Sequence, residues 1–201
     1  MRVYVTGGTG FVGSNVVKVA TEEYGATVFT TVHSWRPDAQ ASYQYGPVDM
    51  TNRDQVLDSV RAFRPDAIIH SAILKGFDLM YADRGLAWRS YVDSTRYLTE
   101  AANEVGAKMI LISSDWVFDG TQSNAGETTP PNPVNLYGVL KVVGETIVLE
   151  TAKDGAVARI SGVNGVHWIR PDEPQEQSVG FGSLIGALLA TAGHSRPFAV
   201  W

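Results

Sequence analysis

The sequence predicts an α/β fold built on a doubly wound parallel sheet. Short apolar runs rich in β-branched residues alternate with helical patterns from the first residue onward, which is typical of parallel strands covered by helices on both faces. Strands are expected at residues 3–6, 27–32, 67–70, 108–113 and 156–160, with a short additional strand at residues 43–48. Helices are expected at residues 10–23, 52–63, 84–104 and 136–152.

Local signals define where some of these elements end. Thr51 is expected to cap the second helix, with Asp54 three residues later, and Pro65 stops that helix. Residues 170–178 are rich in Pro, Glu and Gln and indicate a solvated loop or linker. Residues 181–192 predict one further apolar helix, too short for a membrane span.

Length and composition limit the class of protein. A chain of 201 residues with 44% hydrophobic residues is sufficient for a buried core. A net charge of -5 speaks against a nucleic-acid partner, because phosphate binding needs clustered Lys and Arg. The chain has no cysteine, and its four histidines lack ligand spacing, so no metal site is expected. With no run long enough to cross a bilayer, we expect a cytoplasmic protein without a membrane partner.

A glycine-rich turn follows the first expected strand. Gly7 permits a tight turn, Gly10 lets the backbone approach a pyrophosphate, and Gly13 lets the next helix pack close to the strand. Phe11 and Val12 open that helix, whose free N–H groups and dipole attract phosphate. The order of strand, glycine turn and helix therefore predicts a dinucleotide cofactor site.

The end of the second strand indicates which dinucleotide is preferred. NAD-preferring enzymes usually place a carboxylate there to bind the ribose 2′-hydroxyl, whereas this chain has His33, Ser34 and Arg36 near that position. Because no carboxylate repels a 2′-phosphate, and Ser34 and Arg36 can donate hydrogen bonds to it, NADP(H) is preferred and NAD(H) is the second choice. The alternative is that Arg36 is a solvated loop residue.

A tyrosine and a lysine share one face of the last long helix. Tyr137 and Lys141 are four residues apart, so both side chains project toward a common point. The ordinary pKa of tyrosine is about 10, and a neighbouring ammonium stabilises the phenolate. The pair is therefore a candidate general acid or base.

The sequence around this pair resembles the extended short-chain dehydrogenase/reductase family, and most of all its dTDP-4-dehydrorhamnose reductase branch. That branch has a segment of the form STDYVFDG followed by PxNxYGxxKxxGE, and this chain has SSDWVFDG at residues 113–120 and PVNLYGVLKVVGE at residues 133–145. The resemblance implies a Rossmann fold, with an NAD(P)-binding domain at residues 1–165. Residues 166–201 would be the incomplete beginning of a smaller substrate-binding region.

The same resemblance implies roles for the catalytic residues. Ser114 would hydrogen-bond the substrate oxygen, Tyr137 would transfer its proton, and Lys141 would bind the nicotinamide ribose and tune Tyr137. The implied activity is NADPH-dependent reduction of a nucleotide-linked 4-keto-deoxysugar. A sugar nucleotide is thus the expected small-molecule partner, and association into a homodimer is left open.

Further cofactor contacts are implied along the ends of the strands. Asp49, followed by Met50, would lie at the adenine, and Ser71 and Ala72 would flank the cofactor. His70 comes just before them. We interpret it as a core histidine hydrogen-bonded to the backbone rather than as a cofactor contact.

Several positions differ from the family or have a structural interpretation. Tyr91 and Val92 stand where family members usually have Asn and Val, and residues 73–84 do not resemble the reductase branch. Gly144 is expected to serve packing, and Glu145 to lie on the surface or cap the helix.

Two other functions remain as alternatives. A sugar-nucleotide epimerase would use the same three catalytic residues. The chain also resembles the regulatory subunit of methionine adenosyltransferase, which would bind NADP and a partner enzyme without catalysis. Dehydration is disfavoured, because Trp116 stands where family dehydratases have a glutamate after the aspartate.

Overall fold

The computed structural model describes residues 1–33, 37, 41–74 and 76–170. Its strands are β1 (Arg2–Thr6), β2 (Thr27–Val32), β3 (Gln44–Pro47), β4 (Ala67–His70), β5 (Lys108–Ser114) and β6 (Gly155–Ile160). Its helices are α1 (Phe11–Lys18), α2 (Arg53–Phe63), α3 (Phe77–Ala82), α4 (Arg84–Trp88), α5 (Ser94–Val105) and α6 (Leu136–Thr151). Short helical turns are η1 (Val19–Glu23), η2 (Arg89–Asp93) and η3 (Asp115–Val117).

The described strands form one parallel sheet in the order β3-β2-β1-β4-β5-β6. This order is that of a doubly wound Rossmann sheet, so the predicted fold class is confirmed. The strand order reverses beside β1, which pairs with both β2 and β4. In such sheets the carboxyl ends of the strands at the reversal form a crevice, the usual ligand position.

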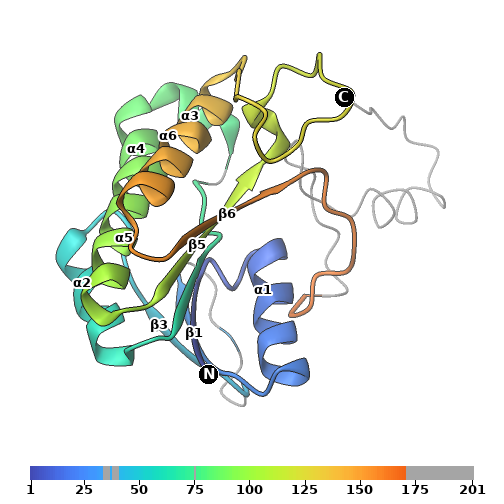
Figure 1. Ribbon diagram of the computed structural model, residues 1–201. Helices are drawn as coiled ribbons and strands as arrows, with labels where there is room; N and C mark the ends of the chain where they lie inside the picture. Colours follow the sequence, from blue (N-terminus) through green and yellow to red (C-terminus); the bar gives the residue numbers. More distant parts are fainter. Residues whose placement is uncertain (34–36, 38–40, 75, 171–201) are drawn as a thin grey trace.

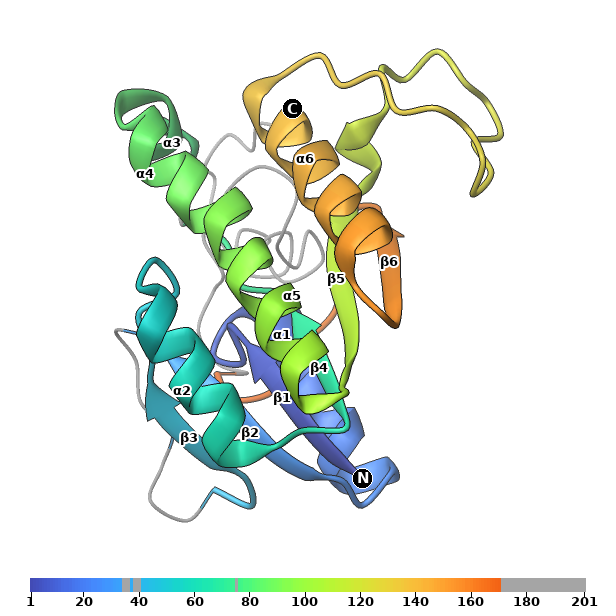
Figure 2. The same cartoon turned by 60° about the vertical axis from the view of Figure 1, so that its left-hand side comes forward.

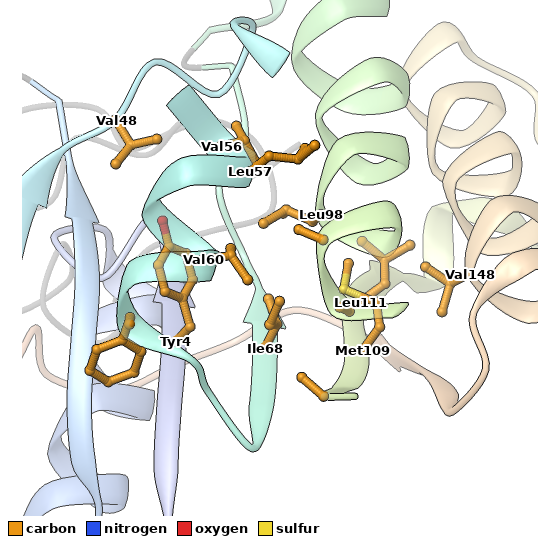
Figure 3. Packing of buried hydrophobic residues seen from close by; sticks show 14 residues of the cluster. Tyr4, Val48, Val56, Leu57, Val60, Ile68, Leu98, Met109, Leu111 and Val148 are labelled. Atoms are coloured by element: carbon orange, nitrogen blue, oxygen red, sulfur yellow. The ribbon is translucent and has the colours of Figure 1, made fainter. Parts of the chain in front are cut away.

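Helices cover the sheet from two sides (Figure 1). Helix α1 packs over β1 and β2, where Val17 meets Val3, Val5 and Val28. On the other face α2, α5 and α6 lie next to one another (Figure 2). The main core fills the space between those helices and the sheet, with Tyr4, Ile68 and Leu111 below Leu57 and Leu98 (Figure 3).

The helices between β4 and β5 differ from the expectation. The helix expected at residues 84–104 is a run of α4, η2 and α5, in which η2 adds a wider π-helical turn around Tyr91. Helix α3 was not predicted at all; it has six residues, and so short an element carries too few turns for a periodic pattern. The carboxylate of Asp83 accepts from the N–H of Leu86 at 2.7 Å and begins α4.

The expected cap of α2 was wrong by one residue. Asn52, not Thr51, caps the helix, with its side-chain oxygen accepting from the N–H of Gln55 at 3.1 Å. Thr51 is instead held in a turn by Asp49, whose carboxylate accepts from the Thr51 N–H at 2.8 Å and hydroxyl at 2.7 Å. Asn and Thr are both good caps, and the preceding turn determines which one is in place.

The expectations for residues 181–192 and most of residues 170–178 lie outside the described residues. Among the described helices, none is long and apolar enough to cross a membrane.

Candidate active site

The glycine turn connects β1 to α1 with little space on its inner side. Gly7 has a φ of 70°, and a Cβ there would lie 2.8 Å from Ala72 Cα. A Cβ at Gly13 would lie 2.7 Å from the Gly7 carbonyl carbon, so α1 begins in contact with the turn. Gly10, in contrast, is exposed, and among the described atoms a Cβ there would meet the Gly7 oxygen at 3.2 Å. Gly7 and Gly13 thus have packing roles, whereas Gly10 faces outward.

Buried threonines hold the turn in place. The Gly7 N–H donates to the Thr31 hydroxyl at 3.2 Å, and the Gly8 N–H donates to that of Thr30 at 3.0 Å. The Thr6 hydroxyl oxygen accepts from the N–H of Ala72 at 3.1 Å. Sequence reasoning missed these residues, although Thr6 ends β1 and Thr30 and Thr31 lie near the end of β2.

Ser71 and Ala72 lie directly beside the glycine turn. The Ser71 hydroxyl donates to the Thr6 carbonyl at 2.6 Å, and its N–H donates to the Thr6 hydroxyl at 3.2 Å. Phe11 and Val12 form the half-buried first turn of α1. The structure therefore brings these cofactor candidates together at the reversal of the strand order.

The residues after β2 and β3 form the outer edge of the same region. His33 and Asp49 are exposed, and Met50 is half-buried against the main core. Hydrogen bonds from Thr51 lower the pKa of Asp49, and His33 adds a smaller effect in the same direction. Ser34 and Arg36, the expected 2′-phosphate ligands, lie outside the described residues.

The three candidate catalytic residues meet at the carboxyl end of β5. Asn135 caps α6 with its side-chain oxygen, which accepts from the Gly138 N–H at 2.8 Å, and this cap places Tyr137 in the first helical turn. The Ser114 hydroxyl donates to the Asp115 carboxylate at 3.1 Å and accepts from the Trp116 N–H at 3.2 Å, and its interaction with Tyr137 lowers the pKa of that tyrosine. The Lys141 ammonium donates to the Ile112 carbonyl at 2.9 Å and lies 5.7 Å from the centre of the Tyr137 ring.

Three aromatic rings enclose Tyr137. Phe77, Tyr91 and Trp116 contact its ring edge-on, with centroid separations of 5.7, 5.8 and 5.7 Å respectively. Phe77 and Trp116 also stack on each other at 5.6 Å. Only 3% of Tyr137 is exposed, so a substrate has to displace at least part of this enclosure to reach the hydroxyl.

Tyr91, which was expected to stand in place of an asparagine of the family, lies within this enclosure. Its ring lies 5.6 Å from the Lys141 ammonium, and its hydroxyl donates to the Leu74 carbonyl at 3.4 Å. The departure therefore lies inside the site, where an aromatic face contacts the lysine.

Burial sets the proton affinities of the cluster. Burial raises the pKa of Tyr137 to about 12, against the opposing effect of the hydrogen bond with Ser114. Burial lowers the pKa of Lys141 to about 8, and the negative charge of Glu145 opposes that change.

The His70 ring lies between the end of β1 and the beginning of α5. Its Nδ1 lies 2.7 Å from the Thr6 hydroxyl, and its Nε2 lies 3.4 Å from the Ser94 hydroxyl. Burial, with a smaller effect from the positive charge of Lys141, lowers the pKa of His70 to about 3. The expected core position of His70 is confirmed, but its ring nitrogens face side-chain hydroxyls rather than the backbone.

The expectation that Glu145 lies on the surface or caps the helix was wrong. Glu145 is 3% exposed, and it accepts from the Ser113 hydroxyl at 2.5 Å and from Arg159 at 2.7 Å. The reason is helical geometry, since Glu145 follows Lys141 by four residues on the face of α6 that packs against β5. Gly144 has the expected packing role, because a Cβ there would lie 3.3 Å from Leu111 Cδ2.

Residues 163–170 pass over the beginning of α1. The Asn15 amide donates to the Val166 carbonyl at 3.1 Å, and Ser14 Oγ lies 3.3 Å from His167 Nδ1. The Arg170 guanidinium donates to the Thr9 carbonyl at 3.2 Å and so brings a positive charge to the glycine turn. Nothing in the sequence near Arg170 indicated that contact, which joins residues 161 positions apart.

Comparisons with known proteins agree with this geometry. A family model described as the RmlD substrate binding domain matches residues 1–168. Methionine adenosyltransferase 2 subunit beta of Bos taurus is 34% identical over 164 residues, which are 82% of this chain and 47% of that protein. The dTDP-4-dehydrorhamnose reductase of Aggregatibacter actinomycetemcomitans is 27% identical over 165 residues, or 82% and 52% of the two chains.

Among solved structures, dTDP-4-dehydrorhamnose reductase from Bacillus anthracis in complex with NADP is similar with a TM-score of 0.72. The match has 25% identity and covers 99% of this chain and 62% of that chain. The chain spans about half the length of the curated relatives it matches.

Proposed function

Because this chain belongs to the RmlD substrate binding domain family, we propose that it binds NADP(H), in preference to NAD(H), and reduces a nucleotide-linked 4-keto-deoxysugar. The observation that carries this proposal is the meeting of Ser114, Tyr137 and Lys141 at the edge of the sheet that also carries the glycine turn. Short-chain reductases need this combination, in which a proton donor lies beside the dinucleotide.

The glycine turn supports the cofactor part of the proposal. Side chains at Gly7 and Gly13 would collide with backbone atoms, while the exposed Gly10 leaves the backbone open to an approaching pyrophosphate. The first turn of α1 directs N–H groups to the same place. The remaining proposed cofactor contacts come from the strand ends and α6: His33, Ser34, Arg36, Asp49, Met50, Ser71, Ala72, Tyr137 and Lys141.

The protein's own residues supply binding and a proton. When bound, the reduced cofactor supplies the hydride. Ser114 then orients the substrate oxygen, and Tyr137 gives that oxygen its proton as the carbonyl is reduced. Lys141 contributes positive charge that favours the resulting phenolate. Those rings among Phe77, Tyr91 and Trp116 that stay in contact with Tyr137 when the substrate enters would exclude water from this transfer.

The proposed division of the chain follows from the same arrangement. Residues 1–165 would form the NAD(P)-binding domain, and residues 166–201 would begin the substrate region. The contact of Arg170 with the glycine turn supports placing the second part next to the cofactor.

Isotope transfer tests the proposal. The full-length gene product should consume one NADPH for each 4-keto-deoxysugar nucleotide, and deuterium from labelled NADPH should appear on the product carbon. Interconversion of sugar epimers without net NADPH consumption would contradict the reductase and favour the epimerase.

A second candidate is a non-catalytic, NADP-binding regulatory subunit. The identity with methionine adenosyltransferase 2 subunit beta favours it, as does the near-complete burial of Tyr137. In this case the protein should co-purify with a methionine adenosyltransferase and change its kinetics. Sugar-dependent NADPH oxidation by the isolated protein would show that regulation is not its whole function.

A further inference from the structure

Three consecutive residues at the end of β5 are each held by a different turn of α6. Ser114 interacts with Tyr137 and lowers its pKa, and the Ile112 carbonyl accepts from Lys141 at 2.9 Å. Between them, the Ser113 hydroxyl donates to Glu145 at 2.5 Å. The helical residues are spaced four apart, so one face of α6 fixes the position of the whole strand end.

Glu145 also joins α6 and β5 to β6. Arg159 lies opposite Ser113 in the sheet register and donates to both carboxylate oxygens, at 2.7 Å and 3.0 Å. The Arg159 side chain is 22% exposed, whereas that of Glu145 is 3% exposed. Burial of a carboxylate is costly without hydrogen-bonding or ionic partners. The contacts with Ser113 and Arg159 offset this cost for Glu145.

The Glu145 carboxylate follows the buried Lys141 by four residues on the same face of α6. The groups around the ammonium are His70 from β4, Tyr91 from η2 and, on α6 itself, Tyr137 and Glu145. His70 is neutral near pH 7, because burial lowers its pKa to about 3. Of these groups, Glu145 therefore supplies the negative charge, part of which the paired Arg159 guanidinium from β6 offsets.

We propose that Glu145 is a positioning residue: through Ser113 and Arg159 it fixes the end of β5, whose Ile112 carbonyl holds the Lys141 ammonium, against α6 and β6. The role in catalysis rests on the proposed function, but the effect on Lys141 does not. Burial alone favours the neutral amine, and Glu145 acts against it.

Lysine NMR tests the assignment without any substrate. The chain contains five lysines, so isotope-labelled lysine in the full chain gives few signals. The signal that is missing from the spectrum of Lys141→Arg is that of the Lys141 side chain. In wild type this signal should titrate with a pKa of about 8. In Glu145→Gln, which keeps the shape but loses the charge, the titration should move to lower pH.

A matched control uses another carboxylate–arginine pair. Glu104 accepts from Arg61 at 2.8 Å but is 38% exposed, so Glu104→Gln should leave the Lys141 titration unchanged. If Glu145→Gln does not fold, the double variant Glu145→Gln with Arg159→Met removes both charges of the pair and should show a smaller displacement in the same direction, because the guanidinium that opposes the carboxylate is lost as well. An unchanged Lys141 titration in the folded charge-removal variant would overturn the proposal.

The activity provides a separate test. If the wild type reduces a sugar nucleotide, Glu145→Gln should move the alkaline limb of the kcat profile to lower pH, in parallel with the NMR titration. An inactive wild type would refute the proposed reductase function, while the NMR titration would still decide the role of Glu145.

Discussion

The same substitution at two glycines of one turn should have opposite consequences. At Gly10, the backbone is extended, with a φ of -83° and ψ of 171°, which valine readily adopts. A Cβ there would come no closer than 3.2 Å to the Gly7 oxygen among the described atoms. At Gly13, a Cβ would press against the Gly7 carbonyl carbon at 2.7 Å and Gly8 Cα at 2.9 Å.

These distances give the expected magnitudes. Gly10→Val loses a moderately good helix cap and should lower the free energy of unfolding by about 1 kcal/mol or less. It should weaken NADPH binding at least about 100-fold, or about 2.7 kcal/mol, because the side chain fills the space of the pyrophosphate. Gly13→Val collides with backbone that cannot rotate away, and should lower the free energy of unfolding by about 2 to 3 kcal/mol.

Urea denaturation and calorimetric titration with NADPH would measure the two effects on the same samples. Wild-type affinity in a folded Gly10→Val protein would show that the dinucleotide does not bind at this turn. Equal stability of the two variants would show that the close approach at Gly13 does not constrain the fold.

Three further predictions concern the proton donor, the choice of cofactor and pH. Tyr137→Phe keeps the ring inside its enclosure but removes the proton, so turnover in the isotope assay should fall roughly 100-fold to 10,000-fold with NADPH affinity nearly unchanged; undiminished turnover would exclude Tyr137 as the acid. Arg36→Ala should weaken NADPH more than NADH by about 1 to 3 kcal/mol in parallel titrations, and equal losses would contradict a 2′-phosphate contact. The pKa of His70 is lowered from 6.5 to about 3 in the folded protein, so the unfolded chain binds a proton more readily than the folded chain does. The contribution of His70 to the free energy of unfolding is therefore present above pH 6.5 and should be lost as the pH falls toward 3. Urea denaturation across this range should show a smaller loss for His70→Gln, and identical pH dependence in both proteins would refute this cause.

The order and type of most elements could be predicted from local sequence. The pattern from Val3 through the glycine turn to α1 specifies strand, turn and helix within a short stretch of chain, and all three are confirmed. The four-residue spacing of Tyr137 and Lys141 is enough to place both side chains on one helical face. The family resemblance of the segments at residues 113–120 and 133–145 is also confirmed by the matching family model.

The tertiary structure decided what surrounds those residues. Glu145 was expected on the surface because its partners, Ser113 and Arg159, lie 32 and 14 positions away in the chain. Tyr91 could be recognised as a departure from the family, but its contact with Lys141 depends on η2 packing against α6.

The amino-acid sequence alone therefore determined most of this protein's strand and helix pattern, though not α3, and the chemistry that its motifs can carry, because those depend on neighbours within a few residues. Burial, charge pairing and the resulting pKa values depend on which distant segments meet. For Lys141, the helix face was determined locally, whereas its proton affinity was decided by the burial that β5 and η2 impose and by the charge of Glu145.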